Sequence, residues 1–237
     1  MTNAAPSEQL RLWATPLGRL QWRQADEVNP TLVRVFRSLR ATDPQARAEA
    51  PFYASRDDLL QRIRLPEWEA LVRFLVEGVR DTAAAANAGL WPTDAGGSAP
   101  GLQIALQGIW FQISNHGVHH DIHTHGNCSW SGVYCLQVDD DAARQAHPVF
   151  GALNGVTRFY GPHFQHLGGA HVDFGNAYLQ QAHFDVAPQP GQLIVFPAWL
   201  AHQAMPYQGS ADRIIVSFNA SVHAASGNDR LHAYARG

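Results

Sequence analysis

The stretch Asn115-His-Gly-Val-His-His-Asp-Ile-His-Thr-His125 places five of the chain's thirteen histidines within ten residues. A sixth, His202, follows the apolar run Leu193-Ile-Val-Phe196, and Arg213 then opens a second apolar run. Imidazole is the commonest metal ligand in proteins. A close pair of ligands on one strand with a distant third is typical of an open-sided transition-metal site in a β-barrel. The sequence therefore predicts a metal centre carried by β-structure.

Length and composition limit the classes of protein to consider. The chain has 237 residues, of which 46% are hydrophobic and 16% charged, so it can bury a sizeable core. A net charge of -3 and scattered basic residues give no reason to expect nucleic acid or an anionic membrane as partner. The apolar runs are too short to span a bilayer, and the first residues lack a signal-peptide pattern. We expect a cytoplasmic protein.

The two parts of the chain differ in their periodicity. Within residues 1–100, apolar residues recur at helical spacing in residues 29–39, which open with a cap-like Asn29-Pro30 pair, and again from Pro66 to Ala86. From Gly101 the pattern changes to short runs rich in β-branched and aromatic residues. These runs predict strands near 103–113, 119–125, 131–138, 156–160, 183–187, 192–196, 203–206 and 212–222.

The predicted strands follow one another too closely for crossover helices, so we expect antiparallel pairing. Helices followed by many short strands predict an α+β fold, in which a helical layer packs on one sheet of a closed or sandwiched β-structure. We expect residues 1–237 to form a single domain. Its parts would be a mainly helical segment (1–100), a β core (101–223) and a C-terminal tail (224–237).

Strand periodicity also selects the candidate ligands. Residues two apart point to the same face of a strand, so His123 and His125 should face the same way. His202 lies at the mouth of a buried strand and needs a partner. Asp121 precedes His123 by two residues, so a register in which Asp121 is a ligand, with His123 or with His119, stays open. The remaining histidines of the cluster, His116, His119 and His120, are expected at the entrance or on the surface.

The order of several motifs carries a resemblance. His123-x-His125, Ser131-Gly-Val-Tyr134, the run from Pro188 to His202 and Arg213-x-x-x-Ser217-Phe-Asn219 resemble a family of bacterial 2-oxoglutarate/Fe(II)-dependent oxygenases. The resemblance is strong from about Gln107 to Val222. It implies a double-stranded β-helix (jelly-roll, cupin-like) core behind the helical part. It also implies an enzyme that couples 2-oxoglutarate decarboxylation to oxidation, by hydroxylation, of a small-molecule, amino-acid or peptide substrate with dioxygen.

The resemblance further implies roles for individual residues. It assigns Fe(II) to His123, His125 and His202, and the distal carboxylate of 2-oxoglutarate to Arg213. A guanidinium offers a carboxylate two parallel hydrogen bonds. Tyr134 and Ser217 would add hydroxyl donors to the same carboxylate.

One position departs from the commonest pattern of such enzymes, because His125 stands where they carry Asp or Glu. Two alternatives therefore stay open. One is a three-histidine metal dioxygenase that uses no 2-oxoglutarate, and the other is a metal-binding jelly-roll without catalysis. The sequence does not specify the substrate or the oligomeric state, and a homodimer is among the expected assemblies.

Overall fold

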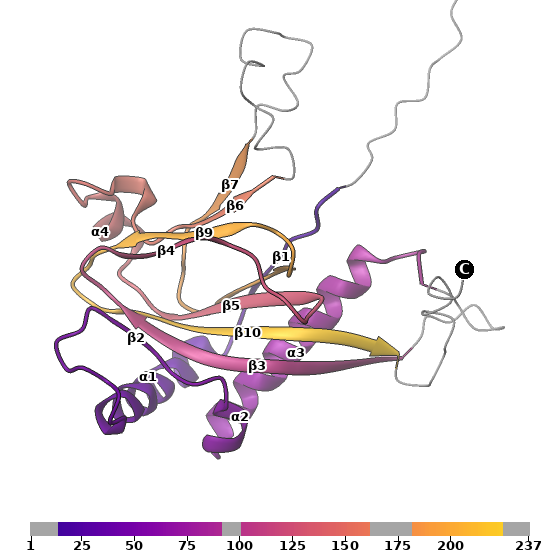
Figure 1. The fold of residues 1–237 in the computed structure, drawn as a ribbon, viewed down its shortest axis with the longest axis horizontal. Helices are drawn as coiled ribbons and strands as arrows, with labels where there is room; N and C mark the ends of the chain where they lie inside the picture. Colours follow the sequence, from indigo (N-terminus) through magenta and orange to yellow (C-terminus); the bar gives the residue numbers. More distant parts are fainter. Residues whose placement is uncertain (1–13, 92–100, 162–181, 225–237) are drawn as a thin grey trace, which may run out of the picture.

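Two antiparallel sheets form the body of the protein. The computed structural model describes residues 14–91, 101–161 and 182–224. Figure 1 shows the smaller sheet lying over one face of the larger sheet, with the helices of the N-terminal part on the other face of the larger sheet. The larger sheet has, in spatial order, β1 (Gly18–Gln21), β8 (Gln192–Pro197), β5 (Trp130–Gln137), β10 (Arg213–Ala224), β3 (Leu102–Ser114) and β2 (Phe52–Ala54). The smaller sheet has β4 (Val118–His123), β9 (His202–Tyr207), β6 (Thr157–Tyr160) and β7 (His183–Val186).

The helices lie mainly in the N-terminal part, as predicted. They are α1 (Ala25–Thr42), α2 (Leu59–Arg62), α3 (Pro66–Ala86), α4 (Asp141–Gln145) and the short 3-10 helix η1 (Gly151–Leu153). In α3, proline stands in the first turn, where its missing N–H has no helical partner to lose. None of the helices in the described ranges is long and apolar enough to cross a membrane. The structure thus confirms the predicted α+β class.

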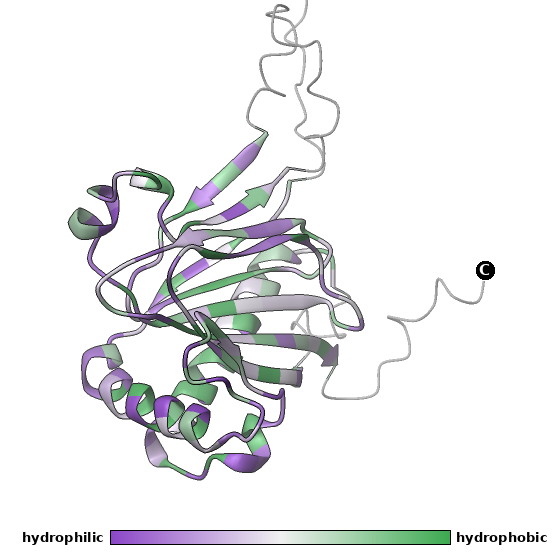
Figure 2. Ribbon diagram, turned by 60° about the vertical axis from the view of Figure 1, so that its left-hand side comes forward, coloured by the Kyte–Doolittle hydropathy of each residue, from purple (hydrophilic) through white to green (hydrophobic). Residues whose placement is uncertain are grey.

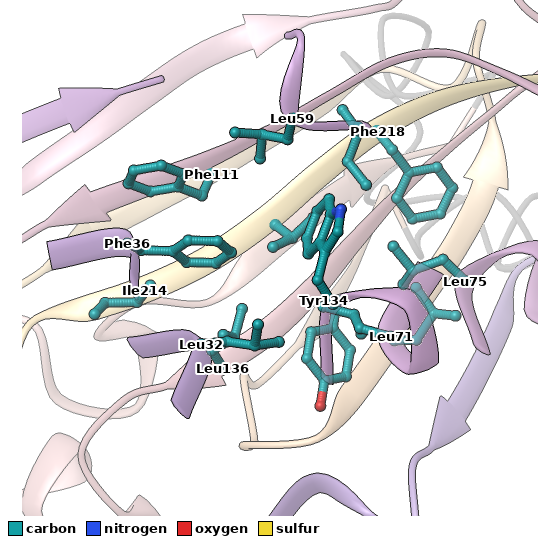
Figure 3. Close-up of a cluster of buried hydrophobic side chains, with 14 of the residues drawn as sticks. Leu32, Phe36, Leu59, Leu71, Leu75, Phe111, Tyr134, Leu136, Ile214 and Phe218 are labelled. Carbon is teal, nitrogen blue, oxygen red and sulfur yellow. The ribbon is translucent and has the colours of Figure 1, made fainter. Parts of the chain in front are cut away.

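An apolar core joins the helices to the larger sheet. Figure 3 shows Leu32 and Phe36 of α1 and Leu71 and Leu75 of α3 lying against side chains of that sheet. Phe36 stacks on Phe111 of β3 with ring centroids 4.3 Å apart. Burying each such side chain stabilises the fold by roughly 1.5–3 kcal/mol. In Figure 2 the helical ribbons alternate between hydrophobic and hydrophilic residues, as expected for helices with one buried face.

The start of α1 differs from the prediction. The helix begins at Ala25, one turn before the Asn29-Pro30 pair, so Asn29 lies inside the helix and is buried. Its side chain accepts a hydrogen bond from Tyr134 Oη (2.8 Å) and donates one to the carbonyl of Leu136 (3.1 Å). Asn29 is therefore a bridge between α1 and β5 instead of a helix cap.

Side chains of β10 point alternately to its two faces. One face packs in the apolar core beneath the helices, and the other faces the space between the two sheets. Ile214, Val216 and Phe218 pack in the core beneath the helices, whereas Arg213 and Ser217 line a cavity on the opposite face of the strand. The neighbouring strand β5 keeps a glycine in register with Phe218, and a side chain at that position, Gly132, would overlap the Phe218 ring. The interior face of β10 is the face on which the candidate site is built.

Candidate metal centre

Three imidazoles from distant parts of the chain meet at one point. His123 ends β4, His125 follows it, and His202 begins β9, where it pairs in register with His123. One ring nitrogen of each lies within 4.8 Å of the others. The backbone N–H of His125 donates to the carbonyl of Ala198 (2.9 Å), which fixes the segment after β4 against the loop that precedes His202.

Backbone carbonyls orient two of the three rings. Nδ1 of His123 lies 2.7 Å from the carbonyl oxygen of Asp121, and Nδ1 of His202 lies 3.0 Å from that of Leu200. A carbonyl can only accept, so each Nδ1 carries the proton and each Nε2 keeps a free lone pair. This is the tautomer that a metal ligand requires.

The spacing of the ring nitrogens suits a single ion. Nε2 of His125 lies 3.3 Å from Nε2 of His202. Two nitrogens at right angles around an ion, each at a bond length of about 2.1 Å, would lie about 3 Å apart. Three imidazoles arranged in this way could hold a transition metal and leave coordination positions for other molecules.

Burial favours the neutral form of two of the three imidazoles, those of His125 and His202. The pKa of His202 is lowered to about 4, chiefly by burial and to a smaller extent by the neighbouring His123 and His125, while a hydrogen bond to the carbonyl of Leu200 acts in the opposite direction. Burial likewise lowers the pKa of His125, with a smaller effect of His123 in the same direction. Because a metal binds only the unprotonated ring, these shifts reduce the competition from protons.

A β-bulge decides which residues of β4 face the interior. The register against β9 shifts between His120 and His123, so the simple alternation expected from the sequence fails there. Asp121 consequently turns outward, with its side chain 96% exposed and its Oδ1 3.7 Å from Nε2 of His119. The structure therefore brings neither Asp121 nor His119 to the three-histidine cluster, and the register that involved them is not supported.

Arg213 is the first residue of β10, and its side chain is buried. It lines, with His123, His125 and His202, a cavity of about 50 Å³ between the sheets. Its Nε has no hydrogen-bond partner within the described ranges. Burial lowers the pKa of the guanidinium, because removing a cation from water disfavours its charged form. A buried cation without an anion is strongly destabilising, so this cavity is suited to a carboxylate.

The two hydroxyl residues predicted to assist Arg213 lie on different faces of the larger sheet. Ser217 faces the cavity. Tyr134 points the other way, into the core, where it contacts Trp22 and donates its hydroxyl hydrogen bond to Asn29. The prediction of a cofactor-binding role for Tyr134 is corrected on this ground, because its position in β5 is out of phase with the cavity.

Several residues of the cavity were not assigned to the metal or cofactor site from the sequence, although Trp110 was expected in the core or in a pocket wall. Trp110 and Gln112 of β3, Thr157 of β6 and His120 of β4 all line the cavity. Trp110 and Gln112 are two residues apart in a predicted strand, so their side chains should point to the same face of the sheet. The sequence does not say which face of the sheet lines the cavity. His120 was expected at the entrance or on the surface, and the bulge brings it inside.

A family model described as "Putative 2OG-Fe(II) oxygenase" matches residues 108–219, the segment that holds all three histidines and Arg213. The match covers 112 of the 237 residues and runs from β3 to β10, so the β core is similar to that of this family. Fe(II) and 2-oxoglutarate are the cofactors that define this family. The chain is accordingly an enzyme of the 2OG-Fe(II)-dependent oxygenase class. None of the curated proteins matches the chain.

Several solved structures share the fold. The non-heme alpha ketoglutarate dependent epimerase SnoN from nogalamycin biosynthesis superposes with a TM-score of 0.55 at 15% identity, covering 92% of this chain and 82% of its own. AviO1 from Streptomyces viridochromogenes gives 0.50 at 15% identity, with 86% and 90% covered. A prolyl hydroxylase from Trichoplax adhaerens gives 0.50 at 11% identity, with 86% and 83% covered. The shared fold is the double-stranded β-helix.

Proposed function

We propose that His123, His125 and His202 hold Fe(II), and that Arg213 binds the distal carboxylate of 2-oxoglutarate, with Ser217 as an additional donor. The observation that carries this proposal is the buried guanidinium of Arg213, which has no partner for its Nε in the described chain and lines the cavity on which the three imidazoles open. A dioxygenase that uses no keto acid, or a jelly-roll that only stores metal, would have no need of a desolvated cation there.

We further propose that the reaction is the hydroxylation of a small-molecule, amino-acid or peptide substrate. The chemistry that bound iron supplies is the coupling of 2-oxoglutarate decarboxylation, to succinate and carbon dioxide, to the transfer of one oxygen atom of dioxygen into a substrate C–H bond. The protein's part is to bind, orient and exclude water. The rings of Phe196 and Phe159 pack against His202, with centroids 4.6 and 5.9 Å away, and keep that side of the centre dry.

A second, larger cavity lies beside the metal centre and offers a route by which the substrate could reach it. It measures about 590 Å³ and has His125 in its wall, together with Trp130 and Trp199. Among the described residues, no acidic side chain, lysine or arginine lines it. We propose that the substrate presents an uncharged group here, on the His125 side of the metal centre.

We also propose that residues 1–237 are one domain, because α1 and α3 share a single apolar core with the larger sheet. The cytoplasmic location and the homodimer remain predictions.

Oxygen uptake tests the function. The protein, loaded anaerobically with Fe(II), should consume oxygen and form succinate only when 2-oxoglutarate is supplied. Arg213→Gln should lower that consumption at least about tenfold through loss of a charged hydrogen-bonding partner, and the iron content should be unchanged. Oxygen uptake that is indifferent to 2-oxoglutarate would favour the three-histidine dioxygenase. Iron binding without any turnover or succinate would favour the non-catalytic protein.

A further inference from the structure

The interior of the sandwich is arranged in rows of side chains that run across the strands. In the smaller sheet, the row that contains His123 and His202 is followed by a row in which His120 pairs with Ala204 and Ala204 with Thr157. The next row along β4 and β9 pairs Val118 with Tyr207. His120 therefore stands one row inward from the metal ligands.

The side chains of the larger sheet that face the cavity form corresponding rows, which again begin at the metal ligands. Ser217 pairs with Trp110, whose ring lies 6.5 Å from that of His125 and so belongs to the row of the metal ligands. Ile215 forms the next row and Arg213 the one after it, and both line the same cavity as His120. Two residues along a strand span roughly 7 Å. His120 thus stands between the metal centre and Arg213.

The imidazole of His120 lacks a polar partner of its own. No described residue forms a hydrogen bond with its ring nitrogens. Its packing contacts are the edge of Phe52 (5.2 Å between centroids) and His123 (6.3 Å). Ala204, its register partner, is too short to fill the space beside it. A half-buried ring with unused nitrogens faces the same cavity as Arg213.

From this placement we propose that His120 is a positioning residue, which donates a hydrogen bond to the distal carboxylate of the keto acid beside Arg213. The proposal rests on the proposed function above. Neutral and protonated imidazole both carry an N–H, so the role does not depend on the charge of the ring. Together the two side chains would select a keto acid with a second carboxylate over a monocarboxylate of the same length.

Calorimetric titration of the full-length, nickel-loaded protein tests this without turnover. The two probes are 2-oxoglutarate and 2-oxopentanoate, which has the same five carbons but no distal carboxylate. His120→Phe keeps the ring volume and removes the donor, whereas His120→Gln keeps an N–H. His119→Phe, on the exposed outer face of the same strand, is the matched control.

We expect His120→Phe to weaken binding of 2-oxoglutarate about tenfold, the effect of losing one hydrogen bond to a charged group. Binding of 2-oxopentanoate and the nickel content should stay unchanged, His120→Gln should recover most of the loss, and His119→Phe should behave as wild type. Equal weakening of both keto acids, no weakening, or a fall in nickel content would each overturn the assignment of His120. A wild-type protein that binds 2-oxoglutarate no better than 2-oxopentanoate would instead refute the proposed function.

Discussion

His123 of β4 and His202 of β9 lie opposite each other in the register of the smaller sheet, with ring centroids 4.3 Å apart. Strand pairing thus brings two candidate ligands together from distant parts of the chain before any metal binds. Each ring is also oriented by a backbone carbonyl that accepts from its Nδ1. A site organised in this way needs little rearrangement on metal binding.

Removal of either paired ligand should empty the metal centre. We expect His202→Ala and His123→Ala to lower the iron content of the purified protein strongly, because two imidazoles hold an ion far less well than three. His119→Ala, on the outer face, should keep it. Metal analysis by mass spectrometry measures all three, and equal iron content in the three variants would refute the ligand assignment.

The bulge in β4 turns Asp121 away from the metal centre, so we expect substitutions of Asp121 and His125 to affect iron binding differently. Because the Asp121 carboxylate is exposed to solvent, Asp121→Asn should retain iron. His125→Ala should lose it, since Nε2 of His125 faces Nε2 of His202. The same metal analysis decides between them. Iron lost from Asp121→Asn but kept by His125→Ala would transfer the ligand role to the carboxylate.

Burial of His202 predicts a pH dependence of stability in the metal-free protein. Its pKa is about 4 in the folded protein and 6.5 as an ordinary value. Below pH 6.5 the unfolded chain takes up a proton that the folded protein does not, so the stability from this group is present above pH 6.5 and declines as the pH falls towards 4. Between pH 7 and pH 4.5 the decline should be about 2 kcal/mol.

Urea unfolding at these two pH values measures that decline. His202→Gln carries no titrating group, so its free energy of unfolding should fall by about 2 kcal/mol less than that of the wild type over the same interval. Parallel decreases in the two proteins would contradict the prediction. Histidines such as His120 and His125, whose pKa values burial also lowers, are present in both proteins and cancel in the comparison.

Substitutions of Tyr134 and Ser217 should affect different properties, the first the stability of the fold and the second the affinity for 2-oxoglutarate. Tyr134→Phe removes a buried hydrogen bond to Asn29 and should lower the free energy of unfolding by about 1 kcal/mol, with 2-oxoglutarate affinity unchanged. Ser217→Ala should do the opposite, weakening 2-oxoglutarate several-fold with little change in stability. Urea unfolding and calorimetry give the two quantities. A loss of 2-oxoglutarate affinity in Tyr134→Phe would restore the original prediction for that residue.

Most of the strands could be located from the sequence, because alternation and turn residues are local signals. The strand predicted at 103–113, for example, appears as β3 at Leu102–Ser114. Two strands were missed, β1 and β2, which have four and three residues and lie at the edges of the larger sheet. Segments this short carry too little periodicity to stand out within a part of the chain dominated by helices.

By itself, the sequence determined the element types, the antiparallel pairing and the set of residues from which a metal centre could be drawn, because these depend on composition and on periods of 2 and 3.6 residues. Only the tertiary structure decided which of them meet. The bulge that turns Asp121 outward and His120 inward exists only through pairing with β9. Tyr134 faces away from the cavity because the helices cover the opposite face of β5, where Asn29 of α1 accepts its hydrogen bond. Both outcomes depend on contacts between segments distant in the chain, to which a local pattern is insensitive.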